Sequence, residues 1–303
     1  MVTSVYFSND NIQIVTGSAN GKTIQIKEVL TAKLPENSMI NGVITSDYGI
    51  KKTMTELWGM RSVKTSAASL VIDSSSILTK TLVVPPVKPA KLSRIIMGEY
   101  AEVENFEDML YDYLLINPKV EGGGAAILSC AAEKSFIQSY VELFDALKIK
   151  LECIDIALNC EIKLINKLSQ MKGRTAIVAI LDKNTLVLTL FVNGTYRFIS
   201  RSRLFEDRGS QGSFDEISRA LSSLIQFNSS EKSGYSITDI FFCGLNNDEK
   251  YICDEMTALF NPITAKIFPD SDEVNFKLKK LSTSVKTPVV SDYIYSIGNL
   301  IRL

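Results

Sequence analysis

Two stretches of the chain share one pattern of apolar and polar positions, in which apolar runs alternate with short polar turns. Residues 4–29 and residues 176–201 each read as strand, polar turn, strand, Asn-Gly turn, strand. The two asparagines that frame the middle strand, Asn11 and Asn20 in the first copy, lie nine positions apart in both copies. An Asn-Gly pair between alternating apolar residues is a strong hairpin signal. The repeat therefore predicts two related three-stranded meanders.

Segments with apolar residues at helical spacing follow each meander, and further short apolar runs read as strands. The predicted helices cover residues 47–60, 91–101, 133–147, 157–168, 213–227, 249–259 and 291–303. The further predicted strands cover residues 67–84 with a polar turn at 73–76, 125–130, 148–156, 237–243 and 263–268. Residues 106–116 fit a strand, with a helix as the alternative, and residues 270–288 read as loop with some helix. The pattern predicts two α/β halves facing each other across a cleft, with the polar turns pointing into it.

Charge balance and the length of the apolar runs exclude two classes of partner. The chain has 33 Lys and Arg against 34 Asp and Glu, so no surplus of positive charge supports a nucleic-acid footprint. The longest apolar runs, residues 175–181 and 186–192, are far shorter than the ~20 residues of a membrane-spanning helix. The N-terminus shows no signal-peptide pattern. We therefore expect a cytoplasmic protein with no nucleic-acid partner and no direct membrane insertion.

Chemistry that needs histidine is excluded, because the chain has none. This removes Ser-His-Asp and Cys-His catalysis and also the commonest metal ligand. The five cysteines form no Cys-x-x-Cys pair and lie mostly in apolar context, which is typical of buried free thiols. We predict no catalytic residue and no metal site. An enzymatic alternative would have to use carboxylates, lysines and a bound cofactor.

Four passages of the sequence resemble one known family. They are LVIDSSSILTKTLVVPP (70–86), AAILSCAAEKSFIQSYVELFDALKIKLECIDIALNC (125–160), FDEISRALSSLIQF (214–227) and SDYIYSIGNLIRL (291–303). Together they are similar to the PilM family, the actin-like cytoplasmic proteins of type IV pilus assembly that are related to FtsA. The resemblance implies an α/β, actin-like (ASKHA) duplicated fold, with two halves around a cleft and a small inserted α+β subdomain in the first half. It divides the chain into residues 1–66 and 151–172 (first half), 67–150 (inserted subdomain) and 173–303 (second half).

The resemblance also places nucleotide-contacting loops at the two polar turns and at a glycine-bearing loop near residue 244. The candidate remnant nucleotide residues are Ser8, Asn9, Asp10, Asn11, Asp182, Lys183, Asn184 and Gly244. Tyr6 stands where nucleotide-binding members have an aspartate, Ser8 replaces a glycine, and Gln13 replaces a lysine. Asp182 stands where a phosphate-facing glycine is expected, and its charge would repel a triphosphate at short range. Ordinary Asn/Asp hairpin turns explain the same residues.

Because three nucleotide motifs depart from the pattern together, we expect ATP binding to be weak or lost. The leading hypothesis is a non-enzymatic scaffold of a type IV pilus machine. The resemblance implies that it holds the cytoplasmic tail of a PilN-like inner-membrane protein in a groove between the inserted subdomain and the first half. It would then be peripheral to the inner face of the membrane through that partner and would contact other pilus proteins.

Two alternatives to the scaffold remain open. The first is an ATP- and Mg²⁺-binding assembly or filament protein with a functional cleft and weak ATPase activity. The second, a small-molecule kinase of the same superfamily, lacks a convincing catalytic aspartate.

Several other residues favour a structural interpretation over a functional one. Trp58 has the spacing of a core anchor, and the Glu-Asp pair at 206–207 is typical of a solvated loop rather than of a general base. Arg201 belongs to a set of charges that alternate along strands, which usually marks a solvated face. The lysine cluster at 277–280 is short and lies beside acidic residues, so we expect it to attract an anionic membrane only weakly. The glycines at 122–124 predict a mobile loop near the partner groove.

Overall fold

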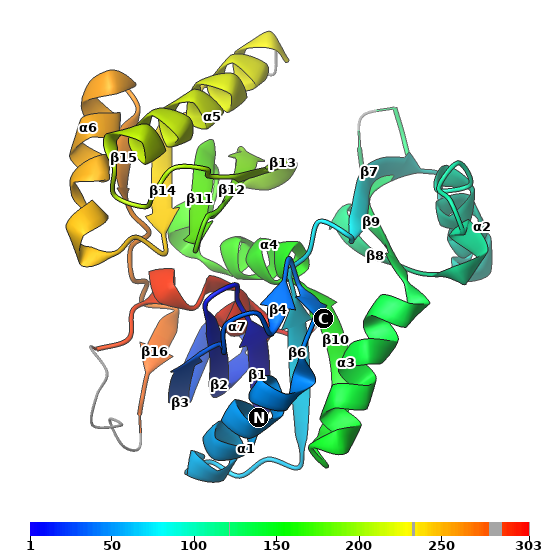
Figure 1. The fold of residues 1–303 in the computed structure, drawn as a ribbon. Helices are drawn as coiled ribbons and strands as arrows, with labels where there is room; N and C mark the ends of the chain where they lie inside the picture. The colour runs from blue at the N-terminus through cyan, green and yellow to red at the C-terminus, as the bar shows by residue number, and fades with distance from the viewer. Residues whose placement is uncertain (121, 232–233, 279–286, 303) are drawn as a thin grey trace.

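The chain folds into two α/β halves stacked on each other, with a smaller subdomain set off to one side of the first half (Figure 1). The computed structural model describes residues 1–120, 122–231, 234–278 and 287–302. Both termini lie at the first half, the lower one in the view of Figure 1.

The first half is built on a six-stranded sheet with the order β10-β6-β1-β2-β3-β16. Its strands are β1 (Val2–Phe7), β2 (Asn11–Asn20), β3 (Thr23–Lys33), β6 (Ala67–Ile72), β10 (Lys150–Ile156) and β16 (Val274–Phe276). The first three form an antiparallel meander, with Phe7 opposite Ile12 and Asn20 opposite Thr23. β6 and β10 continue the sheet in parallel beyond β1, and β16 pairs in parallel with β3. The first predicted meander is confirmed.

The second half repeats this plan with a five-stranded sheet of order β13-β12-β11-β14-β15. Its strands are β11 (Ala176–Asp182), β12 (Thr185–Val192), β13 (Thr195–Arg203), β14 (Asp239–Cys243) and β15 (Thr264–Ile267). Asn193 and Gly194 both have positive φ, 52° and 75°, as a two-residue hairpin turn between twisted strands requires. The second meander is therefore confirmed as well, and β14 and β15 extend its sheet in parallel.

Helices cover the outer faces of both sheets and fill the space between them. They are α1 (Asp47–Met60), α3 (Lys134–Ala146), α4 (Ala157–Lys167), α5 (Gln211–Ser230), α6 (Tyr251–Leu259) and α7 (Ile294–Gly298). α1 and α3 pack on the outer face of the first sheet, and α5 and α6 on the outer face of the second. α4 and α7 lie between the sheets in the largest core, and consecutive α4 residues such as Leu164 and Ile165 are buried. A helix buried on all sides is expected where two sheets enclose it.

The small subdomain is a three-stranded sheet of order β7-β9-β8 that packs on one helix. Its elements are β7 (Leu78–Val84), α2 (Pro89–Glu99), η1 (Phe106–Asp108), β8 (Met109–Asn117) and β9 (Ala125–Glu133). Leu92 and Ile96 of α2 bury against Ile127 of β9 in a separate small core. Residues 106–116 are thus mainly strand. The remaining short elements are β4 (Met39–Ile40), β5 (Val43–Ile44), η2 (Ser169–Met171), η3 (Asn247–Glu249) and η4 (Val290–Asp292).

Sheet membership corrects the division of the chain that the sequence suggests. β6 lies inside the first sheet and α3 packs against the first half, so the inserted subdomain covers residues 78–133 instead of 67–150. β16 and α7 return to the first half, although residues 173–303 were expected to stay in the second. These segments join the first half through pairings with distant strands and helices, and such pairings leave no local signal in the sequence.

The end of the chain also differs from the prediction of one long helix over residues 291–303. Helical structure stops at Gly298, and Asn299 donates side-chain hydrogen bonds to Ser4 Oγ at 2.9 Å and to the Ser69 carbonyl oxygen at 3.2 Å. These bonds tie the chain end to β1 and β6. Two of the lysines at 277–280 lie outside the described residues.

Trp58 is half-buried against the core of the first half, as a core anchor should be. The Arg61 guanidinium lies 3.2 Å from the centre of its ring. The predicted role is confirmed, and the guanidinium over the ring adds a cation–π attraction.

Candidate functional site

The two polar turns meet at the cleft between the halves, as the duplicated pattern predicts. A cavity of about 490 Å³ lies there, and it is lined by the sequence-predicted residues Ser8, Asp10, Asn11, Asp182, Lys183, Asn184 and Gly244. The remaining predicted residue, Asn9, is not part of the lining but contacts Asp182 directly. All eight predicted residues therefore gather at one place.

The backbone N–H groups of the first turn are already engaged within the protein. The N–H groups of Asp10 and Asn11 donate to Ser8 Oγ, at 3.1 Å and 2.8 Å. The N–H of Asn9 donates across the cleft to Asp182 Oδ2 at 2.7 Å. A phosphate group bound here would need these donors, so it would have to displace both acceptors.

Asp182 is the anion that the first turn binds. Its Oδ2 also accepts from Asn9 Nδ2 at 3.1 Å and from the Tyr6 hydroxyl at 3.5 Å. Burial raises the pKa of Asp182 to about 6, while the hydrogen bond from the Asn9 N–H favours the charged form and opposes that rise. The carboxylate is ionised at neutral pH, and it joins two turns that are 173 residues apart in the chain.

Arg208 organises the other side of the cavity. It donates to the carbonyl oxygens of Lys183 at 2.8 Å and Gly244 at 3.0 Å, and it forms a two-point ion pair with the buried Glu249. Gly244 has a φ of +74°, and a Cβ there would lie 2.0 Å from the Leu181 carbonyl oxygen, so only glycine fits. Sequence reasoning missed Arg208, although its place in a polar, glycine-bearing loop was a usable signal.

Two further contacts join the halves. Arg201 of β13 forms an ion pair with Asp73, and both side chains are mostly buried. This corrects the expectation that Arg201 lies on a solvated face. Glu161 of α4 accepts from Thr189 Oγ1 of β12 at 3.0 Å, and burial raises the pKa of Glu161 to about 8. The Glu-Asp pair at 206–207 is not among the residues that line the cavity.

Apart from the cleft cavity, a cavity that we call the groove lies between the inserted subdomain and the first half. It measures about 370 Å³, and its walls are mainly apolar, with Ile77, Leu114, Leu128 and Ile137 among them. The two charged residues in its lining, as far as the structure describes the chain, are Asp112 and Asp155. Sequence reasoning expected a groove in this region but could not assign residues to it.

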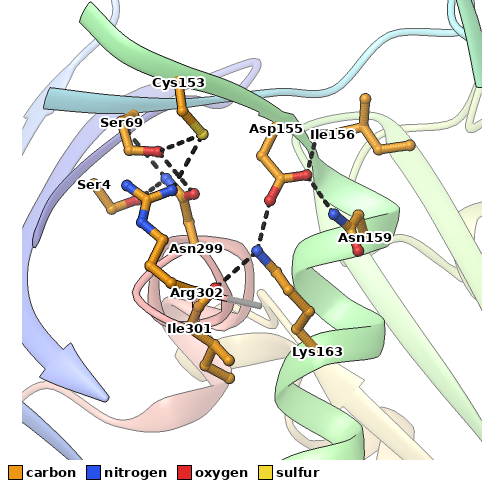
Figure 2. Close-up of polar contacts among 10 residues, drawn as sticks. All are labelled: Ser4, Ser69, Cys153, Asp155, Ile156, Asn159, Lys163, Asn299, Ile301 and Arg302. Carbon is orange, nitrogen blue, oxygen red and sulfur yellow. Dashed lines mark hydrogen bonds and ion pairs between the residues drawn. The ribbon is translucent and has the colours of Figure 1, made fainter. Parts of the chain in front are cut away.

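A buried ion pair stabilises the polar end of the groove (Figure 2). Lys163 Nζ lies 2.6 Å from Asp155 Oδ2 and donates to the Ile301 carbonyl oxygen at 3.1 Å. Asp155 Oδ1 accepts from the Ile156 N–H at 2.8 Å and from Asn159 Nδ2 at 2.7 Å. The network links the end of β10, the start of α4 and the chain terminus, so it holds this end of the groove in one geometry.

A family profile matches the larger part of the chain, which contains both polar turns and the lining of the groove. Residues 4–209 match the family described as type IV pilus assembly protein PilM. The chain belongs to the PilM family. No curated protein matches it at the level of sequence. Among the described residues, none of the helices is long and apolar enough to cross a membrane.

Solved structures similar to this PilM family member share its fold. A chain of a structure described as the PilM–PilN type IV pilus biogenesis complex aligns with a TM-score of 0.83, covering 99% of this chain and 97% of that chain at 12% identity. A Bacteroides thetaiotaomicron protein with an actin-like ATPase fold aligns at 0.55, with 9% identity and coverages of 88% and 90%. EutJ from Carboxydothermus hydrogenoformans aligns at 0.52, with 6% identity and coverages of 99% and 88%. The predicted actin-like fold is confirmed.

Proposed function

We propose that this PilM family member is a non-enzymatic scaffold at the cytoplasmic face of a type IV pilus machine, where it holds the cytoplasmic tail of a PilN-like inner-membrane protein. The agreement in fold with the chain of the PilM–PilN complex, a TM-score of 0.83 over 99% of this chain, carries the proposal. The two other actin-like structures agree only at 0.55 and 0.52. A shape shared so closely with a chain from that assembly favours a shared partner.

The groove is the docking site that we assign to the tail. It lies where the inserted subdomain meets the first half, and apolar walls with a few polar groups are typical of peptide-binding sites. Asp155 at its polar end is held by Lys163, so the groove is preformed and little ordering has to accompany binding.

Titration calorimetry with a synthetic peptide of the PilN-like tail tests this assignment. We expect binding to the wild type and at least about tenfold weaker binding to Ile137→Glu, because the new carboxylate would be buried beneath an apolar ligand. Ile40→Glu is the matched control, since Ile40 is 64% exposed and lies outside the groove lining. No binding of the wild type at high micromolar peptide would contradict the proposed function.

We also propose that nucleotide binding in the cleft is degenerate. The donors that a phosphate would need are bonded to Ser8 and to Asp182, and the Asp182 carboxylate in the cleft lining would repel a phosphate. Two like charges at 4 Å repel by about 1 kcal/mol in water and by about 4 kcal/mol at a protein surface. Arg208, a cation of the lining, already forms an ion pair with Glu249, so its charge is largely neutralised within the protein.

The competing function, ATP and Mg²⁺ binding, is favoured by the size of the cleft cavity, about 490 Å³, and by the strict requirement for glycine at Gly244. A thermal unfolding experiment with Mg-ATP separates the two. Ligand at 100 times its Kd would add about 2.7 kcal/mol, which raises Tm by several degrees. We expect the Tm of the wild type to stay unchanged. A rise of several degrees that disappears when Asn184 and Lys183 are replaced by alanine would establish the competing function instead.

A further inference from the structure

The outer edge of β8 is an exposed and largely apolar strand edge. β8 is the last strand of the β7-β9-β8 sheet, and in the described part of the chain its one pairing partner is β9. Leu110, Tyr113 and Leu115 are 46%, 39% and 50% exposed. A free edge of this kind is a ready template for another strand, and proteins usually cover or guard it.

Cavities flank the same stretch of β8 on both faces of its sheet. The groove and a second cavity of about 430 Å³ share the lining residues Leu110, Tyr111, Asp112 and Tyr113. The second cavity continues over Met97 and Met109 toward the α2 side of the subdomain. A strand added at this edge would therefore find a depression for its side chains on either face.

The strand register assigns the two faces. Leu110, Asp112 and Leu114 lie opposite Ala132, Cys130 and Leu128 of β9, and these six residues line the groove. Tyr111 and Tyr113 alternate with them and face the other side, where the Tyr111 ring packs 5.7 Å from that of Tyr100. Consecutive residues of an added strand would enter the groove and the second cavity in turn.

One edge N–H is capped by the strand's own carboxylate. The Tyr113 N–H donates to Asp112 Oδ1 at 2.8 Å, and the Asp112 carbonyl oxygen accepts from Cys130 Sγ on the β9 side. Asp112 thus occupies the acceptor position that a neighbouring strand's carbonyl would take. A charged side chain at this position guards the free edge against unspecific pairing.

We propose that the occupant of the groove binds by strand addition to the β8 edge at Leu110–Tyr113, and that it is an extended apolar segment with at least one Lys or Arg. This inference rests on the proposed function, because it assigns the segment to the PilN-like tail. A tail carbonyl replaces Asp112 on the Tyr113 N–H, and the released Asp112 carboxylate then pairs with the basic residue. Of the two carboxylates in the lining, Asp155 is already paired with Lys163, which leaves Asp112 for the ligand. Cytoplasmic segments next to a membrane span are rich in Lys and Arg.

Hydrogen–deuterium exchange of the full chain with the synthetic tail peptide tests the binding mode. We expect the backbone amides of Tyr111 and Tyr113, which alternate with those that face β9, to exchange at least tenfold more slowly once the peptide is bound. Peptides N-methylated at successive positions should lose affinity at alternate positions, because only every second N–H of an added strand faces β8. Unchanged exchange at β8 in a complex that calorimetry detects would overturn the strand addition and leave the proposed function standing. A peptide that does not bind at all would overturn both.

Matched variants locate the contact on one face of the strand. Leu110→Ser should weaken the peptide at least tenfold, whereas Leu115→Ser should leave its affinity within twofold, although the two leucines are exposed to a similar degree. Leu115 belongs to neither cavity lining. Asp112→Asn should reduce the dependence of binding on salt concentration, as expected when an ion pair with the peptide is lost. Equal effects of the two serine variants, or an unchanged salt dependence, would contradict the proposal.

Discussion

Gly298→Ala is expected to lower the free energy of unfolding by about 3 kcal/mol or more, or to prevent folding. A Cβ at this position would lie 1.9 Å from the Cys160 carbonyl oxygen and 2.5 Å from its carbonyl carbon. Both are backbone atoms of the buried helix α4, which cannot give way as a flexible side chain could. Overpacking against a fixed core typically costs about 1–3 kcal/mol and more in severe cases. Urea unfolding monitored by circular dichroism measures the change.

Gly59→Ala is the matched control for this substitution. Gly59 lies in helix α1, and a Cβ there would meet no atom within 4 Å. Alanine is favoured over glycine in a helix by about 1 kcal/mol, so we expect this variant to be slightly more stable than the wild type. If the two variants changed stability equally, close contact between α4 and α7 would not be the reason for glycine at position 298.

The parts of the fold that the sequence predicted are those with local causes. The Asn-Gly turns require positive φ, which Gly21 and Gly194 supply, and the alternation of apolar residues between the turns defines the strands. Helix α1 occupies the predicted residues 47–60, because its apolar positions Ile50, Met54 and Leu57 follow helical spacing and are buried. In these segments each local preference agrees with the final fold.

The parts that the sequence could not predict depend on distant contacts. The sequence of β6 predicts a strand but not the sheet to which it belongs. Its parallel pairing with β1 and β10 places it in the first sheet. β16 is three residues long in a polar region, and its pairing with β3 defines it. The closing helix was predicted to reach residue 303, but the hydrogen bonds of Asn299 to Ser4 and Ser69 end it early. Tertiary context overrides local propensity at each of these points.

The candidate site likewise has features that the sequence predicts and features that depend on distant contacts. The repeat predicted that the two turns would meet, because equivalent positions of two facing halves point into one cleft. It could not predict that Asp182 would bond to the Asn9 N–H, since that contact depends on the distance between the halves. For the same reason the ion pair of Arg201 with Asp73 was missed. The contacts of Arg208 with Lys183, Gly244 and Glu249 lie within the second half, but they join segments that are far apart in the sequence.

Lys163→Met is the second substitution with a large expected effect, a loss of about 3–5 kcal/mol in the free energy of unfolding. The Lys163 and Asp155 side chains are only 5% and 12% exposed. Removing the ammonium would leave a buried carboxylate without its cation and take a hydrogen-bond donor from the Ile301 carbonyl oxygen (Figure 2). Breaking a buried pair by deleting one partner typically has a cost of this size. Equilibrium urea unfolding measures it.

The double variant Lys163→Met/Asp155→Leu distinguishes a buried charge from lost packing. Replacing both partners removes the uncompensated charge, so the double variant should recover a large part of the stability that the single variant loses. Recovery should remain incomplete, because the Ile156 N–H and Asn159 Nδ2 would lose their acceptor. Lys51→Met is the surface control: Lys51 pairs with Asp47 in an exposed pair one helical turn apart, which is worth at most about 0.5 kcal/mol. A double variant as unstable as the single one would mean that packing around the Lys163 stem, and not its charge, holds the polar end of the groove.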